Sequence, residues 1–190
     1  MAFVQGMDLD KLEAFRASLK DNPITLGLES RSIWEGHSGR NTTHIGPYTL
    51  AGQRIDRDTR HYTFSYGAWR EVEEAIGFEG PTDRVEPVEM VLGAMGACLS
   101  NSIGINAPRN GITLEGMEII VKADVDPSVL FEVKDPSQHA ACIPNISCEV
   151  KVKGNLNEEQ IKTIQRLIDY SPVHGMVAHA NNITSKVTRV

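Results

Sequence analysis

The sequence predicts an α+β fold, and three features of its pattern support that class. A long helical segment is flanked on both sides by segments in which apolar and polar residues alternate, as in half-buried strands. Strands and helices do not alternate regularly enough for a doubly wound parallel sheet, so we expect antiparallel sheets. The chain of 190 residues contains no repeat and no long linker, and we expect a single domain over residues 1–190.

Residues 1–23 are predicted to form an N-terminal helical extension of this domain. Apolar residues recur at helical spacing after Asp8, a candidate N-cap, and Pro23 stops the pattern. An alternating pattern begins at Ile24, and a polar loop over residues 35–41 ends it. Two further runs rich in aromatic and β-branched residues follow, so we expect strands at residues 24–28, 44–50 and 61–66.

The second half of the chain predicts a long helix, two strands and two shorter helices. The long helix begins at Pro87, because proline suits the first helical position, and ends near Asn106, ahead of the terminator Gly111. Alternation then predicts strands at residues 117–125 and 146–153. The remaining expected elements are a helix capped by Asn157 with Gln160, a short helix starting at Ser171-Pro172, and a closing strand over residues 183–190.

Composition and charge argue against several classes of partner. The net charge of −6 comes without any block of Lys or Arg, which disfavours nucleic acid and anionic membranes. The first residues do not resemble a secretory signal, and no segment is judged long and apolar enough to span a bilayer. Three cysteines, an odd number, favour a reducing compartment over a disulfide framework, so we expect a cytoplasmic protein.

Cys98 is the candidate for chemistry on the long helix. It shares a helix face with Met95 and Ser102, among many small residues. Gly93 and Gly96 each cost about 1 kcal/mol relative to alanine, and close approach by another backbone would compensate. From this helix alone, an inert buried thiol is slightly favoured over a reactive one, because free cysteines are mostly buried.

Other residues compete for a functional role. Cys148 occupies an inward position of a predicted strand and Cys142 a Pro-flanked stretch, but their spacing is a poor metal signal, so we expect no metal or cofactor. His174 could pair with Cys98 if the two helices met, although a capping or surface histidine is more common. Ser171 fits an N-cap better than a catalytic residue, and no hydrolase motif supports a triad with Asp169.

The segment EPVEMVLGAMGACLS, followed by paired strands and a helix ending in DYSPVHGMV, resembles the OsmC/Ohr family of peroxide-stress proteins over about residues 60–190. The resemblance implies an OsmC-like fold, with antiparallel sheets around the long helix, and an intertwined homodimer whose active sites lie at the subunit interface. It implies thiol-dependent reduction of organic or hydrogen peroxides, with Cys98 as the attacking cysteine and Glu89 as the helix-start glutamate. Nine residues of helix separate Glu89 from Cys98 by about 13.5 Å and half a turn, so a contact between them would cross subunits.

Two departures from the family pattern affect the chemistry. Ser171 stands where the family has its second, resolving cysteine, and serine cannot form that disulfide. Gly77 precedes Phe78-Glu79, where the family has an arginine. Arg84 is a candidate replacement, although an exposed loop arginine with no such role is the simpler interpretation.

These residues lead to three functional hypotheses. The first is a one-cysteine peroxidase in which Cys98 attacks the peroxide, helped by Glu89 and a cation, with contacts from Arg84, Ser171 and His174 and with an external thiol as reductant. The second is an OsmC-like dimer without efficient turnover that binds a small, partly apolar ligand at the interface. The third is hydrolase or transferase chemistry by Cys98 and His174, which requires the two side chains within hydrogen-bond reach.

Overall fold

The computed structural model describes residues 3–179 and 181–189, and the chain divides into two compact units. One unit comprises residues 10–91, and the other comprises residues 1–9 and 92–190. Each contains an antiparallel sheet, and a long helix is present, so the predicted α+β class is confirmed. The expectation of one domain with an extension over residues 1–23 stays a prediction.

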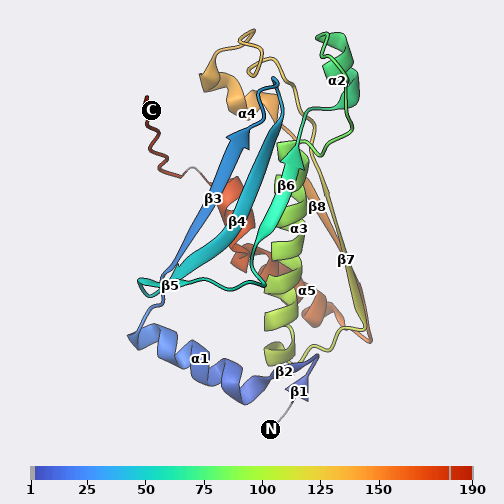
Figure 1. The fold of residues 1–190 in the computed structure, drawn as a ribbon. Helices are drawn as coiled ribbons and strands as arrows, with labels where there is room; N and C mark the ends of the chain where they lie inside the picture. Colours follow the sequence, from blue (N-terminus) through green and yellow to red (C-terminus); the bar gives the residue numbers. More distant parts are fainter. Residues whose placement is uncertain (1–2, 180, 190) are drawn as a thin grey trace. The chain divides into compact units, whose positions relative to one another are not determined.

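The unit of residues 10–91 contains a four-stranded sheet with β4 at its centre (Figure 1). β3 pairs along β4, β5 pairs with the last residues of β4, and β6 pairs with its first residues. The bounds are β3 (Leu26–Trp34), β4 (Asn41–Leu50), β5 (Gln53–Ile55) and β6 (Tyr62–Tyr66). Three predicted strands are confirmed, and β5 is an additional, very short one.

The pairing register gives this sheet two different faces, because directly opposite residues project to the same side. One row across three strands joins Arg31, His44 and Thr63, and this side is called the polar face below. The neighbouring rows project to the other side. They carry mostly aromatic and aliphatic residues, and this apolar face includes Trp34, Ile45, Tyr62, Phe64 and Tyr66.

Two helices accompany the sheet. α1 (Leu9–Asp21) follows Asp8 as predicted, but none of its residues is buried, and Phe15 is 51% exposed. α2 (Arg70–Ala75) was not predicted from the sequence, since its six residues are too few to show a helical period. It buries Glu73, which is discussed below.

The other unit is built on α3 (Pro87–Asn106) and the antiparallel pair β7 (Gly116–Lys122) and β8 (Ser147–Lys153). α5 (Glu158–Leu167) begins with the predicted capping box of Asn157 and Gln160. The core is formed where α3 and α5 meet one side of the β7–β8 pair. Its buried members are Ile103, Ala107, Ile112, Leu114, Ile164 and Leu167, with Met117, Ile119, Val150 and Val152 packed against them.

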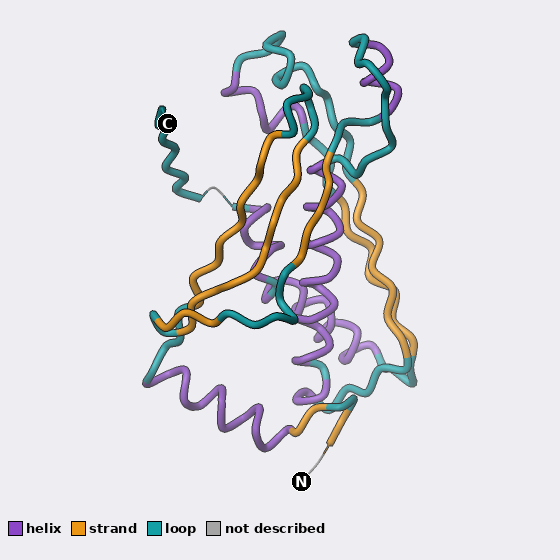
Figure 2. The backbone as a smooth tube through the Cα atoms, in the orientation of Figure 1, coloured by secondary structure: helices purple, strands orange, loops and turns teal. Residues whose placement is uncertain are grey.

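Short elements complete this unit. They are β1 (Phe3–Val4), β2 (Met7–Asp8), α4 (His139–Cys142), α6 (Pro172–Ala178) and three 3₁₀ turns, and Figure 2 distinguishes the helices and strands by colour. The predicted closing strand is wrong, because residues 183–189 form no strand, while Val190 lies outside the described residues. Alternation alone cannot make a strand without a partner for its backbone groups, and Val187 is 99% exposed.

The long helix corrects one expectation from composition. Among the described residues, Pro87–Asn110 is long and apolar enough to cross a membrane, so the expectation that no such segment exists is wrong. The Val, Leu, Ile, Met, Cys and Ala residues of this segment give it its apolar character, and the core helix of a soluble protein meets the same test. Only 22% of its most apolar window is buried, which leaves much apolar helix surface uncovered within the chain.

Candidate functional site

Cys98 lies on the part of α3 that is turned away from β7 and β8. A Cβ atom at Gly96 would meet Val121 Cγ2 at 3.6 Å, so Gly96 faces the strands. Cys98 is two positions later, about 200° around the helix, and therefore leaves from nearly the opposite side. The thiol is free and half-buried, and within the described chain its sulfur takes part in no hydrogen bond.

The glycines of α3 do not show the close backbone approach that we expected. A Cβ atom at Gly93 would meet nothing within 4 Å in the described part of the chain, and the contacts at Gly96 are ordinary van der Waals distances to side chains. Their helix cost is therefore not offset by a close backbone among the residues that the structure describes.

A buried hydrogen bond ties the helix near Cys98 to the end of α5. Ser102, one turn after Cys98, is 7% exposed, and its hydroxyl donates to the carbonyl oxygen of Leu167 at 2.9 Å. The 3₁₀ turn Ile168–Tyr170 follows at once and leads into Ser171. This bond fixes the part of α3 that carries Cys98 beside the segment that leads to Ser171.

Ser171 is an N-cap in the structure, as the Ser-Pro pair predicted. It is 1% exposed, and its hydroxyl oxygen accepts a hydrogen bond from the backbone N–H of His174 at 3.3 Å. The hydroxyl therefore satisfies one of the free N–H groups at the start of α6.

His174 lines a cavity of about 390 Å³ together with Cys148, not Cys98. Asp169 and Met95 also line it, and the rest of the wall is mainly apolar. Burial raises the pKa of the Cys148 thiol, which favours the neutral form. No hydrogen bond joins Cys98 to His174 in the described chain, so the hydrolase hypothesis lacks the contact that it requires. The sequence missed this cavity because its residues come from five separate elements, which are α3, β8, α5, the 3₁₀ turn Ile168–Tyr170 and α6.

Glu89 caps the start of its own helix. Its carboxylate accepts from the backbone N–H of Glu86 at 2.9 Å, and the Glu86 carboxylate accepts from Val88 N–H at 2.6 Å. Burial raises the pKa of Glu86, and the negative charge of Glu89 adds to the effect. Glu86 is thus a second acid at the helix start that the sequence analysis did not single out, although it lies beside Pro87.

Arg84 is held by a carboxylate. Its Nη1 lies 2.9 and 2.8 Å from the two carboxylate oxygens of Glu35, and the side chains of both residues are 29% exposed. The hydrogen bond from Thr42 and the bonds from Arg84 hold the pKa of Glu35 below its ordinary value. Arg84 is therefore a half-buried loop residue that is already paired, and its partner is 49 positions away in the sequence.

A second arginine–carboxylate pair in the same unit is buried. The Glu73 side chain is 0% exposed, accepts from the backbone N–H groups of Thr82 (2.7 Å) and Ala68 (3.2 Å), and lies 3.7 Å from Arg40 Nη2. Burial would raise the pKa of Glu73, but the N–H donors and the Arg40 charge outweigh it, so the pKa is lowered. Arg40 also donates to the carbonyl oxygens of Glu79 and Gly80, while its buried Nε has no partner among the described atoms.

The pattern of α3, the β7–β8 pair and the capped helices α5 and α6 matches a known family. The model of the OsmC-like protein family covers residues 80–186, which is more than half of the chain. The chain belongs to the OsmC-like family. None of the curated proteins matches it.

Solved structures resemble this OsmC-like chain in fold. An OsmC-like protein from Mycoplasma pneumoniae superposes with a TM-score of 0.53 at 12% identity, covering 80% of this chain and 86% of that one. The organic hydroperoxide resistance protein OsmC of Legionella pneumophila gives 0.49 at 14% identity, with 79% and 88% covered. OhrB of Bacillus subtilis gives 0.44 at 13% identity, with 77% and 87% covered. At such identities the first of these supports the OsmC-like fold alone.

The family segment of this OsmC-like chain contains all three cysteines. Besides Cys98 and the cavity thiol Cys148, the third is Cys142, which is 3% exposed in α4. In the described part of the chain, no group of three or more His, Cys, Asp or Glu side chains is placed to hold a metal ion.

Proposed function

We propose that this OsmC-like protein reduces organic hydroperoxides or hydrogen peroxide through Cys98, in a cycle that uses one cysteine. The position of Cys98 carries the proposal: the thiol leaves α3 away from the β7–β8 core, and no hydrogen bond within the described chain occupies its sulfur. It also lies within the family segment, in the stretch EPVEMVLGAMGACLS that resembles peroxide-stress proteins.

The reaction transfers two electrons from sulfur to the peroxide. The Cys98 thiolate attacks one peroxide oxygen, the O–O bond breaks, and the other oxygen leaves with a proton as an alcohol or as water. The sulfenic acid then condenses with an external thiol, which releases water and forms a mixed disulfide. A second external thiol attacks this disulfide and returns Cys98, with a disulfide of the two external thiols as the product.

No other thiol of the same chain is well placed to resolve the sulfenic acid. Ser171 offers only a hydroxyl, and Cys142 is buried in α4. Cys148 lies directly opposite Val121 on the neighbouring strand, so both side chains project to the same side of the strand pair. Val121 faces Gly96 of α3, whereas Cys98 leaves α3 on the other side of the helix. An external thiol is therefore the simplest reductant, and we infer a reducing, cytoplasmic setting that supplies it.

We propose that the active form is a homodimer. α3 leaves Val91 (43%) and Ile105 (45%) exposed, and large apolar residues such as Trp34 (67%) are also exposed on the apolar face of the N-terminal sheet. A second copy would cover such surfaces, because uncovered apolar patches mark association sites. It would also supply the carboxylate of Glu89 and a cation to Cys98, since Glu89 and Cys98 of one helix point in opposite directions.

Hydroperoxide consumption tests the proposed function. The wild-type protein should consume cumene hydroperoxide in the presence of dithiothreitol, and mass spectrometry with a sulfenic-acid trap should label Cys98. The Cys98→Ser variant should be inactive, and Cys142→Ser, which changes a buried thiol elsewhere in the same unit, should retain the activity. An unlabelled Cys98 in folded protein, or equal turnover by Cys98→Ser, would contradict the proposal. Light scattering across a dilution series tests the dimer.

The cavity of about 390 Å³ supports a second candidate function, which is binding of a small, partly apolar ligand without turnover. Its lining combines Met95, Ile168 and Val177 with His174 and Asp169, a mixture typical of ligand sites. Anilinonaphthalene sulfonate is a suitable probe. Binding that is lost in a cavity-filling Ala178→Phe variant, together with no peroxide consumption, would favour this function over the first.

A further inference from the structure

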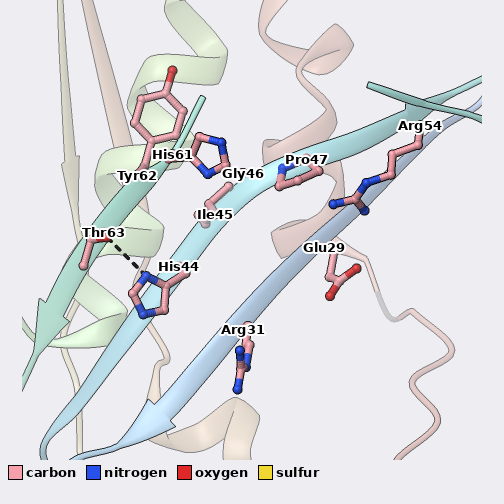
Figure 3. A pocket seen from close by; sticks show the side chains of 10 residues that line it. All are labelled: Glu29, Arg31, His44, Ile45, Gly46, Pro47, Arg54, His61, Tyr62 and Thr63. Atoms are coloured by element: carbon pink, nitrogen blue, oxygen red, sulfur yellow. Dashed lines mark hydrogen bonds between the residues drawn. The ribbon is translucent and has the colours of Figure 1, made fainter. Parts of the chain in front are cut away.

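The polar face of the N-terminal sheet contains a hollow of about 320 Å³ (Figure 3). Gly46, near the middle of β4, forms part of its lining, at a point where the chain at Arg60 and His61 passes close to β4. A Cβ atom there would lie 3.0 Å from the carbonyl oxygen of Arg60 and 3.5 Å from the His61 ring. A side chain at position 46 would therefore press against Arg60 and His61 and shift this part of the lining.

Hydrogen-bond donors from neighbouring strands line the hollow. Arg31, His44 and Thr63 lie directly opposite one another on β3, β4 and β6, and a hydrogen bond of 3.2 Å joins His44 Nδ1 to Thr63 Oγ1. Figure 3 shows this row together with His61 and Arg54 at the far end of the hollow. Strand pairing thus fixes the spacing of Arg31, His44 and Thr63 at roughly 5 Å from strand to strand.

The charge of the lining is positive, in a protein whose net charge is −6. Two arginines and two histidines line the hollow, and Glu29 is the one carboxylate among the lining residues. Arg54 donates to Asp56 at 3.1 Å, and His61 Nε2 lies 3.4 Å from the same carboxylate. Arg31 has no hydrogen bond or ion pair in the described part of the chain, so its guanidinium is available for a ligand.

We propose that this hollow binds the phosphate group of a small molecule. A guanidinium fork matches two phosphate oxygens, and the imidazoles and the Thr63 hydroxyl offer further donors around the same space. A carboxylate has only two oxygens that can accept these hydrogen bonds, whereas a phosphate group has more. The number of donors therefore favours a phosphate group over a carboxylate. The site is independent of Cys98 and of the peroxide chemistry.

The donor row of the hollow stays open in the proposed dimer. Trp34, Phe64 and Tyr66 lie on the opposite face of the sheet from the donor row, and that apolar face is the one that a second copy would cover. Arg31, His44 and Thr63 project from the polar face instead, so association through the apolar face leaves the donors in contact with solvent.

Isothermal titration of the full-length protein with inorganic phosphate tests the site, with sodium acetate and sodium chloride at matched ionic strength as competitors. Phosphate should bind, and acetate should bind more weakly or not at all. Arg31→Gln should weaken phosphate binding about tenfold, the size of one lost charge-assisted hydrogen bond. Glu29→Gln should strengthen it several-fold, because it removes the one negative charge in the lining.

The two variants act in opposite directions, so loss of folding cannot imitate the expected result. Arg70→Gln, which changes an exposed arginine on α2 in the same unit, is the matched control and should bind like the wild type. No phosphate binding by folded wild-type protein would overturn the proposal. Equal affinities of Arg31→Gln, Glu29→Gln and wild type would overturn it as well, because binding would then occur elsewhere.

Discussion

The buried carboxylate of Glu73 gives the sharpest prediction for stability. Glu73→Gln keeps the size of the side chain but removes the charge that pairs with Arg40 and turns one acceptor into a donor facing backbone N–H groups. Removing one partner of a buried pair costs about 3–5 kcal/mol. We expect about 3 kcal/mol, the lower end, because the Arg40 side chain is still 15% exposed and can be partly solvated.

Urea unfolding of the full-length protein at neutral pH measures this effect. With a slope of roughly 2 kcal/mol per molar urea, the midpoint should fall by about 1.5 M. Glu74→Gln, on the same helix but with a carboxylate 50% exposed, is the matched control and should leave the midpoint unchanged. A Glu73→Gln midpoint within about 0.3 M of the wild type would refute the reasoning.

The pH dependence gives a second measurement of the same interaction. The pKa of Glu73 is lowered in the folded protein, so its stabilisation is fully present above the ordinary pKa of a glutamate. That stabilisation is lost as the pH falls through the folded-state pKa, where the carboxylate takes up a proton. The difference between wild type and Glu73→Gln should therefore shrink in acid, and a difference that grows in acid would argue against a charged Glu73.

Three further predictions concern the unit that carries Cys98. Leu99→Ala should lower the free energy of unfolding by about 3 kcal/mol, because Leu99 is 0% exposed, and urea titration would detect it. Asn157→Ala should lower the free energy of unfolding by about 1 kcal/mol, because the capping box at the start of α5 is lost. The helical circular dichroism of the protein should fall as well, and an unchanged signal would contradict this expectation. In native protein, iodoacetamide should alkylate Cys98 well before Cys142, because Cys142 is buried. Cys148 should react only at a higher pH than a free thiol, because burial raises the pKa of the Cys148 thiol. Mass spectrometry of the quenched peptides would show the order of alkylation.

Capping residues and the spacing of apolar residues were enough to predict several helices and strands correctly. Pro87 marks the start of α3, and Asn157 with Gln160 marks the start of α5, because a cap satisfies N–H groups within three residues. The β7–β8 alternation also predicts two strands correctly, since both bury one side against α3 and α5. The closing strand failed because its pattern has no partner strand, which sequence periodicity cannot reveal.

The site depended on contacts between distant residues, and these were harder to predict. Cys98, Glu89 and Ser171 could be proposed from the sequence because each belongs to a local motif, and their roles stay predictions. The Glu35 partner of Arg84 is 49 residues away, and Arg40 is far in sequence from Glu73. The cavity thiol Cys148 meets its neighbours only after β8, α5 and α6 have packed, so sequence spacing could not distinguish it from Cys98 as a neighbour of His174.

The buried hydroxyl of Ser171 links two properties that are usually considered separately. It starts α6, and α6 supplies His174, Val177 and Ala178 to the wall of the cavity. A thiol at that position would be a poorer acceptor for the His174 N–H, so a gain in disulfide chemistry would come with a looser helix start and a less well-defined wall. A substitution of Ser171 by cysteine would therefore gain a resolving thiol and lose part of the support for the cavity wall.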